Sequence, residues 1–129
     1  MVRRAVPGDM PRLVAWGQEF HAHVAPAWDF SADGFAEVMR VLMASGFVAV
    51  SDDGFICGVK VANPIAKDWI VAKEFLWWAD GSGAALFAAF REWASDANEI
   101  QFSCPKARKA FERRAKITEL IYSELPTCV

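Results

Sequence analysis

The sequence of 129 residues predicts a mixed α/β fold, and three observations lead to this prediction. Some segments repeat apolar residues at helical spacing, while others are short β-type runs bounded by turn residues. The segments follow the order strand, helix, helix, three strands, helix, strand, helix, strand. A Gly-rich connection near the middle joins a strand directly to a helix. We therefore expect one domain, 1–129, with a central mixed, mostly antiparallel sheet flanked by about four helices.

The N-terminal part carries a short strand followed by two helical patterns. Met1–Val6 is expected as the strand, and Pro7 with Asp9 suits the first turn of a helix. Ser31 is a candidate N-cap for the second helix, and Gly46 is its expected end. The apolar faces consist of Leu13, Val14, Trp16, Gly17, Phe20 and Val24 in the first helix and Phe35, Val38, Met39, Leu42 and Met43 in the second.

The middle of the chain reads as three strands. Phe47–Val50 and Phe55–Ala62 flank the turn Asp52-Asp53-Gly54, which is typical of a hairpin. Trp69–Trp78 is a strongly apolar third strand. The remaining elements are a tight connection at Asp80–Gly83, a helix at Ala84–Ala94, a strand at Ile100–Ser103, a basic helix at Pro105–Arg114 and a strand at Ile117–Leu125.

Composition excludes several classes of function. A formal net charge of −2 disfavours broad binding to nucleic acid or to an anionic membrane. No segment reaches the roughly 20 apolar residues of a membrane span, and no signal peptide is recognised, so a cytoplasmic location is expected. Cys57, Cys104 and Cys128 are odd in number and lack metal-ligand spacing. Reduced cysteines and no metal site are therefore expected.

Four stretches of the chain resemble one known family. They are Val2–Pro11, Phe47–Gly58, Lys73–Ala84 and Ala110–Arg114. In the same order, they are similar to the first strand and helix start, the central hairpin, the fourth strand with its pyrophosphate loop, and the tyrosine-bearing helix of the GNAT superfamily. The GNAT proteins are acyl-CoA-dependent N-acetyltransferases. The run Glu74–Trp78 is especially similar to small phage and prophage members.

This resemblance implies acetyl-CoA as a loosely held cofactor and an amine as the acceptor, with direct acetyl transfer between them. A helix N-terminus exposes unpaired N–H groups and a partial positive charge, and glycines let a diphosphate approach the backbone. By resemblance, the cofactor-binding residues are Leu76, Trp77, Trp78, Ala79, Gly81, Ser82, Gly83 and Ala84. A strand N–H, such as that of Trp78, is expected to stabilise the oxyanion.

The chain also departs from the family pattern. Its loop, Asp80–Ala85, is short and lacks the usual basic residue, and an Asp beside a diphosphate is unfavourable. Phe111 stands where many members have tyrosine, and it has no proton to donate. The alternative function is therefore a catalytically inactive, phage-encoded interaction module of the same fold. Such a module would bind a protein partner or form a homodimer.

Two side chains are candidate catalytic groups. Glu74 interrupts an apolar strand, so burial would raise its pKa and suit it to act as general base. The alternative is that Glu74 faces solvent or pairs with Lys73 or Lys60. Tyr122, the single tyrosine, is a candidate replacement for the missing acid, with a packing role as its alternative.

Other conspicuous residues have simpler interpretations. His21 and His23 face different sides of a helix, so they are expected as solvated surface residues and not as a joint metal site. Trp77 and Trp78 are adjacent on a strand and should point to opposite faces of the sheet. The basic residues Lys106, Arg108, Lys109, Arg113, Arg114 and Lys116 are expected to form a solvated helix face, with contact to the CoA 3′-phosphate or to nucleic acid as alternatives.

Overall fold

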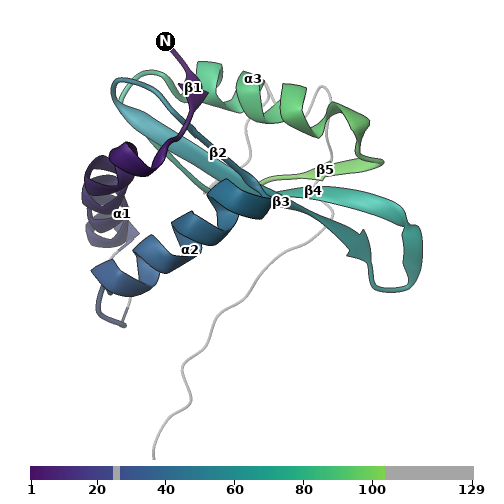
Figure 1. Ribbon diagram of the computed structural model, residues 1–129, viewed down its shortest axis with the longest axis horizontal. Helices are drawn as coiled ribbons and strands as arrows, with labels where there is room; N and C mark the ends of the chain where they lie inside the picture. The colour runs from purple at the N-terminus through teal and green to yellow at the C-terminus, as the bar shows by residue number, and fades with distance from the viewer. Residues whose placement is uncertain (25–26, 104–129) are drawn as a thin grey trace, which may run out of the picture.

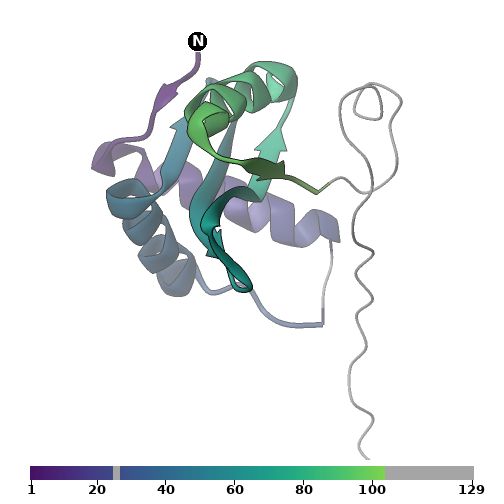
Figure 2. The same cartoon turned by 90° about the vertical axis from the view of Figure 1, so that its right-hand side faces the viewer.

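A computed structural model describes residues 1–24 and 27–103 of the chain. Figure 1 shows α1 and α2 on one face of a twisted sheet and α3 on the other, and Figure 2 shows the same layers from the side. The elements are β1 (Arg3–Arg4), η1 (Pro7–Asp9), α1 (Met10–Val24), α2 (Ala32–Ser45), β2 (Phe47–Val50), β3 (Gly54–Asn63), β4 (Ala66–Ala79), α3 (Gly83–Trp93), η2 (Ala94–Asp96) and β5 (Glu99–Gln101).

The five strands of the described part form one sheet in the order β1-β2-β3-β4-β5. The first four strands run antiparallel to their neighbours, and β5 runs parallel to β4. β3 and β4 are the two longest strands, and their hairpin extends past the layers of helices (Figure 1). The predicted mixed, mostly antiparallel sheet is therefore confirmed.

Two apolar cores fill the spaces between the sheet and the helices. The core on the α3 side contains Phe47, Ala49, Ile56, Ala72, Leu86, Phe87, Phe90 and Ala94. The core on the side of α1 and α2 contains Leu13, Met39, Leu42, Val48, Val50, Phe55 and Cys57. Because β2 and β3 contribute alternate residues to each core, both of their faces are buried.

Local signals in the sequence placed several boundaries correctly. The Ser31 side chain accepts a hydrogen bond from the Gly34 N–H at 3.1 Å, so Ser31 is the N-cap of α2. Gly46 follows the last turn of this helix, as predicted. The β2–β3 turn closes with a hydrogen bond of 2.9 Å from the Ser51 N–H to the Gly54 carbonyl.

Other boundaries differ from the prediction. β1 has two residues instead of six, because only Arg3 and Arg4 pair with β2 before Pro7 turns the chain. β4 begins at Ala66 instead of Trp69, since pairing with β3 starts directly after the turn at Pro64. The described residues contain the first three predicted α-helices. The predicted fourth helix and the last strand lie outside these residues. No helix in the described ranges is both long and apolar enough to cross a membrane.

Asp9 ties the start of α1 to the first strand. Its carboxylate accepts two hydrogen bonds from the Arg3 guanidinium, at 2.7 and 2.8 Å, and one from the Val6 N–H at 2.8 Å. These bonds, those from Arg3 first, lower the pKa of Asp9 to about 2. The carboxylate therefore stays ionised in the folded protein at pH values where it is protonated in the unfolded chain.

Asp9→Ala is expected to lower the free energy of unfolding at pH 7 by about 1–3 kcal/mol, because the Val6 N–H and the Arg3 guanidinium lose their buried acceptor. The contribution of Asp9 is complete above the unfolded pKa near 4 and is lost as pH falls toward about 2. Urea unfolding at pH 7 and pH 3 measures both effects. Asp68→Ala, at an exposed position of β4, is the control. Equal acid sensitivity of wild type and Asp9→Ala would contradict this assignment.

Candidate functional site

The candidate site begins where β4 and β5 separate. These strands pair only from Val71 to Lys73 on β4 and from Glu99 to Gln101 on β5, and β4 then continues to Ala79. Past Gln101, the Ser103 N–H donates to the side chain of Glu74 on β4 instead of to the β4 backbone. Within the described residues the C-terminal half of β4 therefore has no β5 partner, and α3 begins shortly after it.

A β-bulge marks the point of separation. On β3, Cys57 is opposite Leu76, and the next residue, Gly58, is opposite Glu74, so Phe75 is an extra residue in β4. A bulge of this kind re-aims the side chains around it. The alternation of side chains is shifted here: Ala72 belongs to the α3-side core, whereas Leu76 packs on the side of α1 and α2.

Glu74 lies at this bulge and is half-buried. Its Oε1 accepts hydrogen bonds from the N–H and the hydroxyl of Ser103, at 3.0 and 3.3 Å. Burial raises the pKa of Glu74, and the two bonds from Ser103 partly oppose this shift. Lys60 instead pairs with Asp96 at 2.8 Å. Among the described residues no ion pair joins Glu74 to a lysine, so the predicted pairing alternative is not found.

The backbone of the end of β4 presents two different edges. The Asp80 N–H donates to the Asp53 carbonyl at 3.2 Å, which fixes the alternation of this antiparallel ladder. The N–H and C=O groups of Leu76 and Trp78 therefore face β3, while those of Trp77 and Ala79 face the side on which β5 lies. The expected oxyanion role of the Trp78 N–H is consequently wrong, because that group points into the β3–β4 ladder.

The N-terminus of α3 follows β4 through a turn at Gly81, whose φ of 124° is a left-handed value that glycine adopts readily. The first amide to make a helical bond is that of Leu86, which donates to the Ser82 carbonyl at 3.0 Å. Within the described residues, the N–H groups of Gly83, Ala84 and Ala85 have no hydrogen-bond acceptor. These three amides carry the partial positive charge of the helix end.

Asp53, from the β2–β3 turn, lies against this helix end. Its Oδ1 accepts a short hydrogen bond from the Ser82 hydroxyl and lies 3.1 Å from the Ser51 hydroxyl. The Ser51 and Ser82 hydroxyl oxygens are 2.6 Å apart. The Asp53 Oδ2 is 3.1 Å from the position that a Cβ on Gly81 would occupy. The Ser82 hydroxyl, followed by the Ser51 hydroxyl and the Ser82 N–H, lowers the pKa of Asp53, so the carboxylate is ionised.

The predicted site residues of the described part follow one another from the bulge into α3, but they do not share one edge: in β4 past the bulge, Trp77 and Ala79 present backbone groups on the side away from β3, whereas Leu76 and Trp78 do not. Glu74 and the strand and loop residues all lie between the bulge and the first turn of α3. Trp77 packs with the α3-side core and Trp78 with the opposite core, which confirms that they point to opposite faces. Tyr122, Phe111 and the basic segment lie outside the described residues.

Sequence reasoning missed Asp53, Ser51 and Ser103 as members of this site. The first two lie in the hairpin turn and meet Ser82 because β3 begins where β4 ends, with Gly54 opposite Ala79. Ser103 meets Glu74 only through the parallel β4–β5 pairing, which no local pattern specifies.

Of the two histidines, His23 is exposed as predicted, whereas His21 is less solvated than predicted. His21 is half-buried, and its Nε2 lies 2.7 Å from the Trp28 carbonyl oxygen. His23 is exposed, with its ring centroid 5.2 Å from that of Trp78. Within the described ranges, no group of three His, Cys, Asp or Glu side chains has the arrangement of a metal site.

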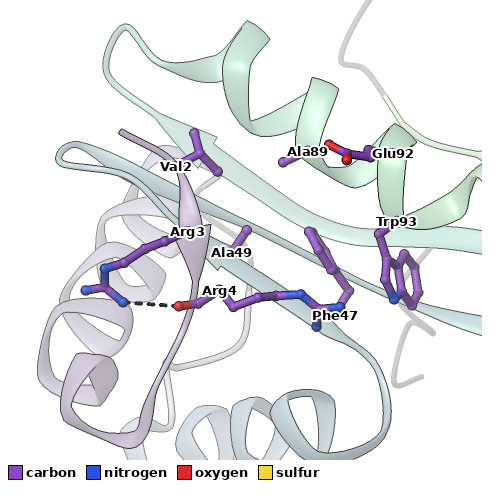
Figure 3. A pocket seen from close by; sticks show the side chains of 8 residues that line it. All are labelled: Val2, Arg3, Arg4, Phe47, Ala49, Ala89, Glu92 and Trp93. Atoms are coloured by element: carbon purple, nitrogen blue, oxygen red, sulfur yellow. Dashed lines mark hydrogen bonds between the residues drawn. The ribbon is translucent and has the colours of Figure 1, made fainter.

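A separate open cleft of about 390 Å³ lies between β1 and the C-terminal half of α3 (Figure 3). It is lined by Val2, Arg3, Arg4, Phe47, Ala49, Ala89, Glu92 and Trp93. The Arg4 guanidinium covers the Phe47 ring at 4.5 Å, and Arg3 is held by Asp9. Both cations of this cleft therefore already have partners in the protein, whereas the helix N-terminus near β4 still has amides to offer.

The mixed sheet, with one parallel strand pair and a helix that begins directly after β4, defines an α/β fold that solved structures share. A predicted acetyltransferase from Clostridium acetobutylicum, solved with acetyl-CoA, matches with a TM-score of 0.73 and 10% identity, over 98% of this chain and 95% of that chain. An aminoglycoside acetyltransferase from an uncultured soil metagenomic sample, solved with sisomicin, matches with a TM-score of 0.63 and 15% identity, over 100% and 96%.

A transcriptional regulator from Bacillus halodurans is similar to the same degree, with a TM-score of 0.68 and 12% identity over 98% of this chain and 99% of that chain. No protein-family model and no curated protein sequence matches this chain. The matches to solved structures over nearly the whole chain show that it has the fold of the GNAT acetyltransferases, as the sequence resemblance predicted. Because such distant similarity defines the fold alone, function is argued from the site.

Proposed function

We propose that this protein is an acyl-CoA-dependent N-acetyltransferase that transfers an acetyl group directly from acetyl-CoA to an amine. The observation that carries the proposal is the N-terminus of α3, placed at the separated end of β4, where the amides of Gly83, Ala84 and Ala85 are available to a diphosphate. The acyl-carrying arm would lie along the edge of β4 that faces away from β3.

Glu74 would act as the general base in this proposal. It lies at the bulge where β4 leaves β5, and its pKa is raised by burial, so its carboxylate is more basic than an exposed glutamate. The proton leaves the amine nitrogen for Glu74 as the nitrogen attacks the acetyl carbonyl. The carbon–sulfur bond then breaks and the CoA thiolate leaves. The role of Tyr122 as proton donor to that thiolate stays a prediction from sequence.

The first test is binding of acetyl-CoA by calorimetry and thermal shift. Wild type should bind saturably, with a stabilisation of about 2.7 kcal/mol at one hundred times Kd. Ala84→Glu places a carboxylate beside the free amides, while it also suits the helix dipole, so folding is preserved. We expect it to weaken binding at least about fivefold by charge repulsion.

Ala88→Glu is the matched control, because Ala88 is exposed on the same helix one turn further along. This variant should bind acetyl-CoA as wild type does. Acceptors are then screened by release of free CoA with a polyamine, a lysine peptide and sisomicin. Absence of any stabilisation by acetyl-CoA or CoA at millimolar concentration would overturn the proposed function.

A second candidate function is a catalytically inactive interaction module of this fold. Two observations favour it: the Asp53 carboxylate already occupies part of the helix end, and the β3–β4 hairpin exposes apolar side chains near its tip. The exposed fractions are 96% for Ile65, 44% for Trp69 and 41% for Val61. Sedimentation of wild type and of Ile65→Lys tests for self-association through this tip. Self-association of wild type that Ile65→Lys abolishes, together with no binding of acetyl-CoA, would fit this second function.

A further inference from the structure

We propose that Asp53 is an internal anion that competes with a bound diphosphate for the N-terminus of α3 and thereby sets the affinity of this site. The inference rests on the proposed function, because it describes how the same helix end discriminates among anionic ligands. Asp53 belongs to the β2–β3 turn, so the competing charge comes from a part of the chain distant in sequence from the loop it contacts.

The contacts of Asp53 are those expected of an anion at a helix end. Its carboxylate accepts the Ser82 hydroxyl proton, lies near the Ser82 N–H that precedes the helix, and has Oδ2 3.1 Å from the position of a Cβ on Gly81. A phosphate oxygen bound to the amides of Gly83, Ala84 and Ala85 would lie beside this carboxylate and would compete with it for the Ser82 hydroxyl. Two anions cannot share these donors without a repulsive cost, so a diphosphate must either displace the Asp53 side chain or bind only to the remaining amides.

The turn that carries Asp53 is held in place by a second set of contacts. The Arg12 guanidinium donates to the Ser51 and Asp52 carbonyl oxygens, at 3.1 and 3.0 Å, and also covers the Trp16 ring at 4.7 Å. The Asp80 N–H binds the Asp53 carbonyl from the other side. Because the backbone of the turn is fixed from both sides, only rotation of the Asp53 side chain can clear the helix end.

Asp53→Asn tests the proposal with the smallest change in shape. The amide oxygen of asparagine can still accept the Ser82 proton, so the turn keeps its structure while the negative charge is removed. The probe is inorganic pyrophosphate, followed by the NMR amide shifts of Gly83, Ala84 and Ala85. We expect Asp53→Asn to bind pyrophosphate about tenfold more tightly than wild type at low salt.

Asp52→Asn is the matched control. It changes the same net charge one residue away, but the Asp52 side chain is 96% exposed and its nearest cation is the N-terminal amine at 3.7 Å. Its pyrophosphate affinity should remain within about twofold of wild type, because a solvated charge is screened. Should Asp53→Asn fail to fold, Ser82→Ala replaces it. That variant removes the hydroxyl that holds the carboxylate, and α3 loses no side-chain cap of its own.

The outcomes separate this inference from the proposed function. Tighter binding of both pyrophosphate and acetyl-CoA by Asp53→Asn supports both. Tighter pyrophosphate binding without acetyl-CoA binding by any variant supports the role of Asp53 and overturns the acetyltransferase proposal. If Asp53→Asn and Asp52→Asn bind pyrophosphate equally, or if neither binds it, the role of Asp53 is overturned. Acetyl-CoA binding by wild type would then still support the proposed function.

Discussion

Glu74→Gln is expected to lower kcat/KM for acetylation of an amine by about 10²–10⁴-fold, the usual contribution of a general base, while acetyl-CoA binding is preserved. The substitution is nearly isosteric, and the glutamine oxygen can still accept the Ser103 N–H that Glu74 accepts at 3.0 Å. The bulge and the separation of β4 from β5 should therefore persist. What is lost is the group that takes the proton from the amine.

The pH dependence gives this prediction a second signature. Burial raises the pKa of Glu74, and a base acts in its ionised form, so kcat/KM should increase with pH through a pKa above the ordinary value near 4.3. Glutamine does not titrate, so Glu74→Gln should lose this rise. Ser103→Ala removes a hydrogen bond that favours the ionised carboxylate, and it should therefore move the rise to higher pH.

Glu37→Gln is the matched control for these measurements. Glu37 is exposed on α2, which packs on the opposite side of the sheet from α3, and the substitution changes the same chemical group. Its kcat/KM and pH profile should equal those of wild type. If Glu74→Gln also retains full activity with an unchanged pH profile, an amine that is already deprotonated attacks without help from this side chain.

Features that depend on residues close in sequence were predictable, and features that depend on contacts between distant segments were not. Ser31 and Gly46 were recognised as helix ends because capping depends on residues within one turn. The bulge at Phe75 depends on strand register, which is set by packing on both faces of the sheet and not by local sequence. The contact between Asp53 and Ser82 depends on the relative lengths of two strands, so a residue interpreted only as part of a turn proved to lie at the helix end.

Glu74 illustrates an intermediate case. An apolar run around a carboxylate predicts burial and hence a raised pKa, and the structure has both. The partner of the carboxylate was not predictable, because the nearby lysines were the obvious candidates by sequence distance. The observed donor, Ser103, is brought to Glu74 by the parallel pairing of β4 with β5.

Gly58→Ala is expected to lower the free energy of unfolding by about 2–3 kcal/mol, because the added methyl group overpacks the core. Most substitutions at exposed positions cost far less. A Cβ at Gly58 would collide with the Lys73 carbonyl oxygen of β4 and would lie 2.7 Å from Cε2 of Phe90. Phe90 is fully buried and packs against Phe47 and Trp93, with ring centroids 6.2 and 5.8 Å apart, so its ring has no space to move. Urea unfolding followed by tryptophan fluorescence measures the change.

Gly8→Ala is the matched control, since no atom lies within 4 Å of a Cβ at that position, and it should change stability by less than about 0.5 kcal/mol. The double variant Gly58→Ala with Phe90→Leu relieves the contact with the ring but not the contact with the β4 backbone. Its destabilisation should therefore be smaller than the sum of the two single changes by at least about 0.5 kcal/mol. Strict additivity would mean that the ring is not what excludes a side chain at Gly58. Because Gly58 is opposite Glu74 in the bulge, the folded fraction of Gly58→Ala should also lose the proposed acetyltransferase activity, which would link the packing of the α3-side core to the placement of the proposed base.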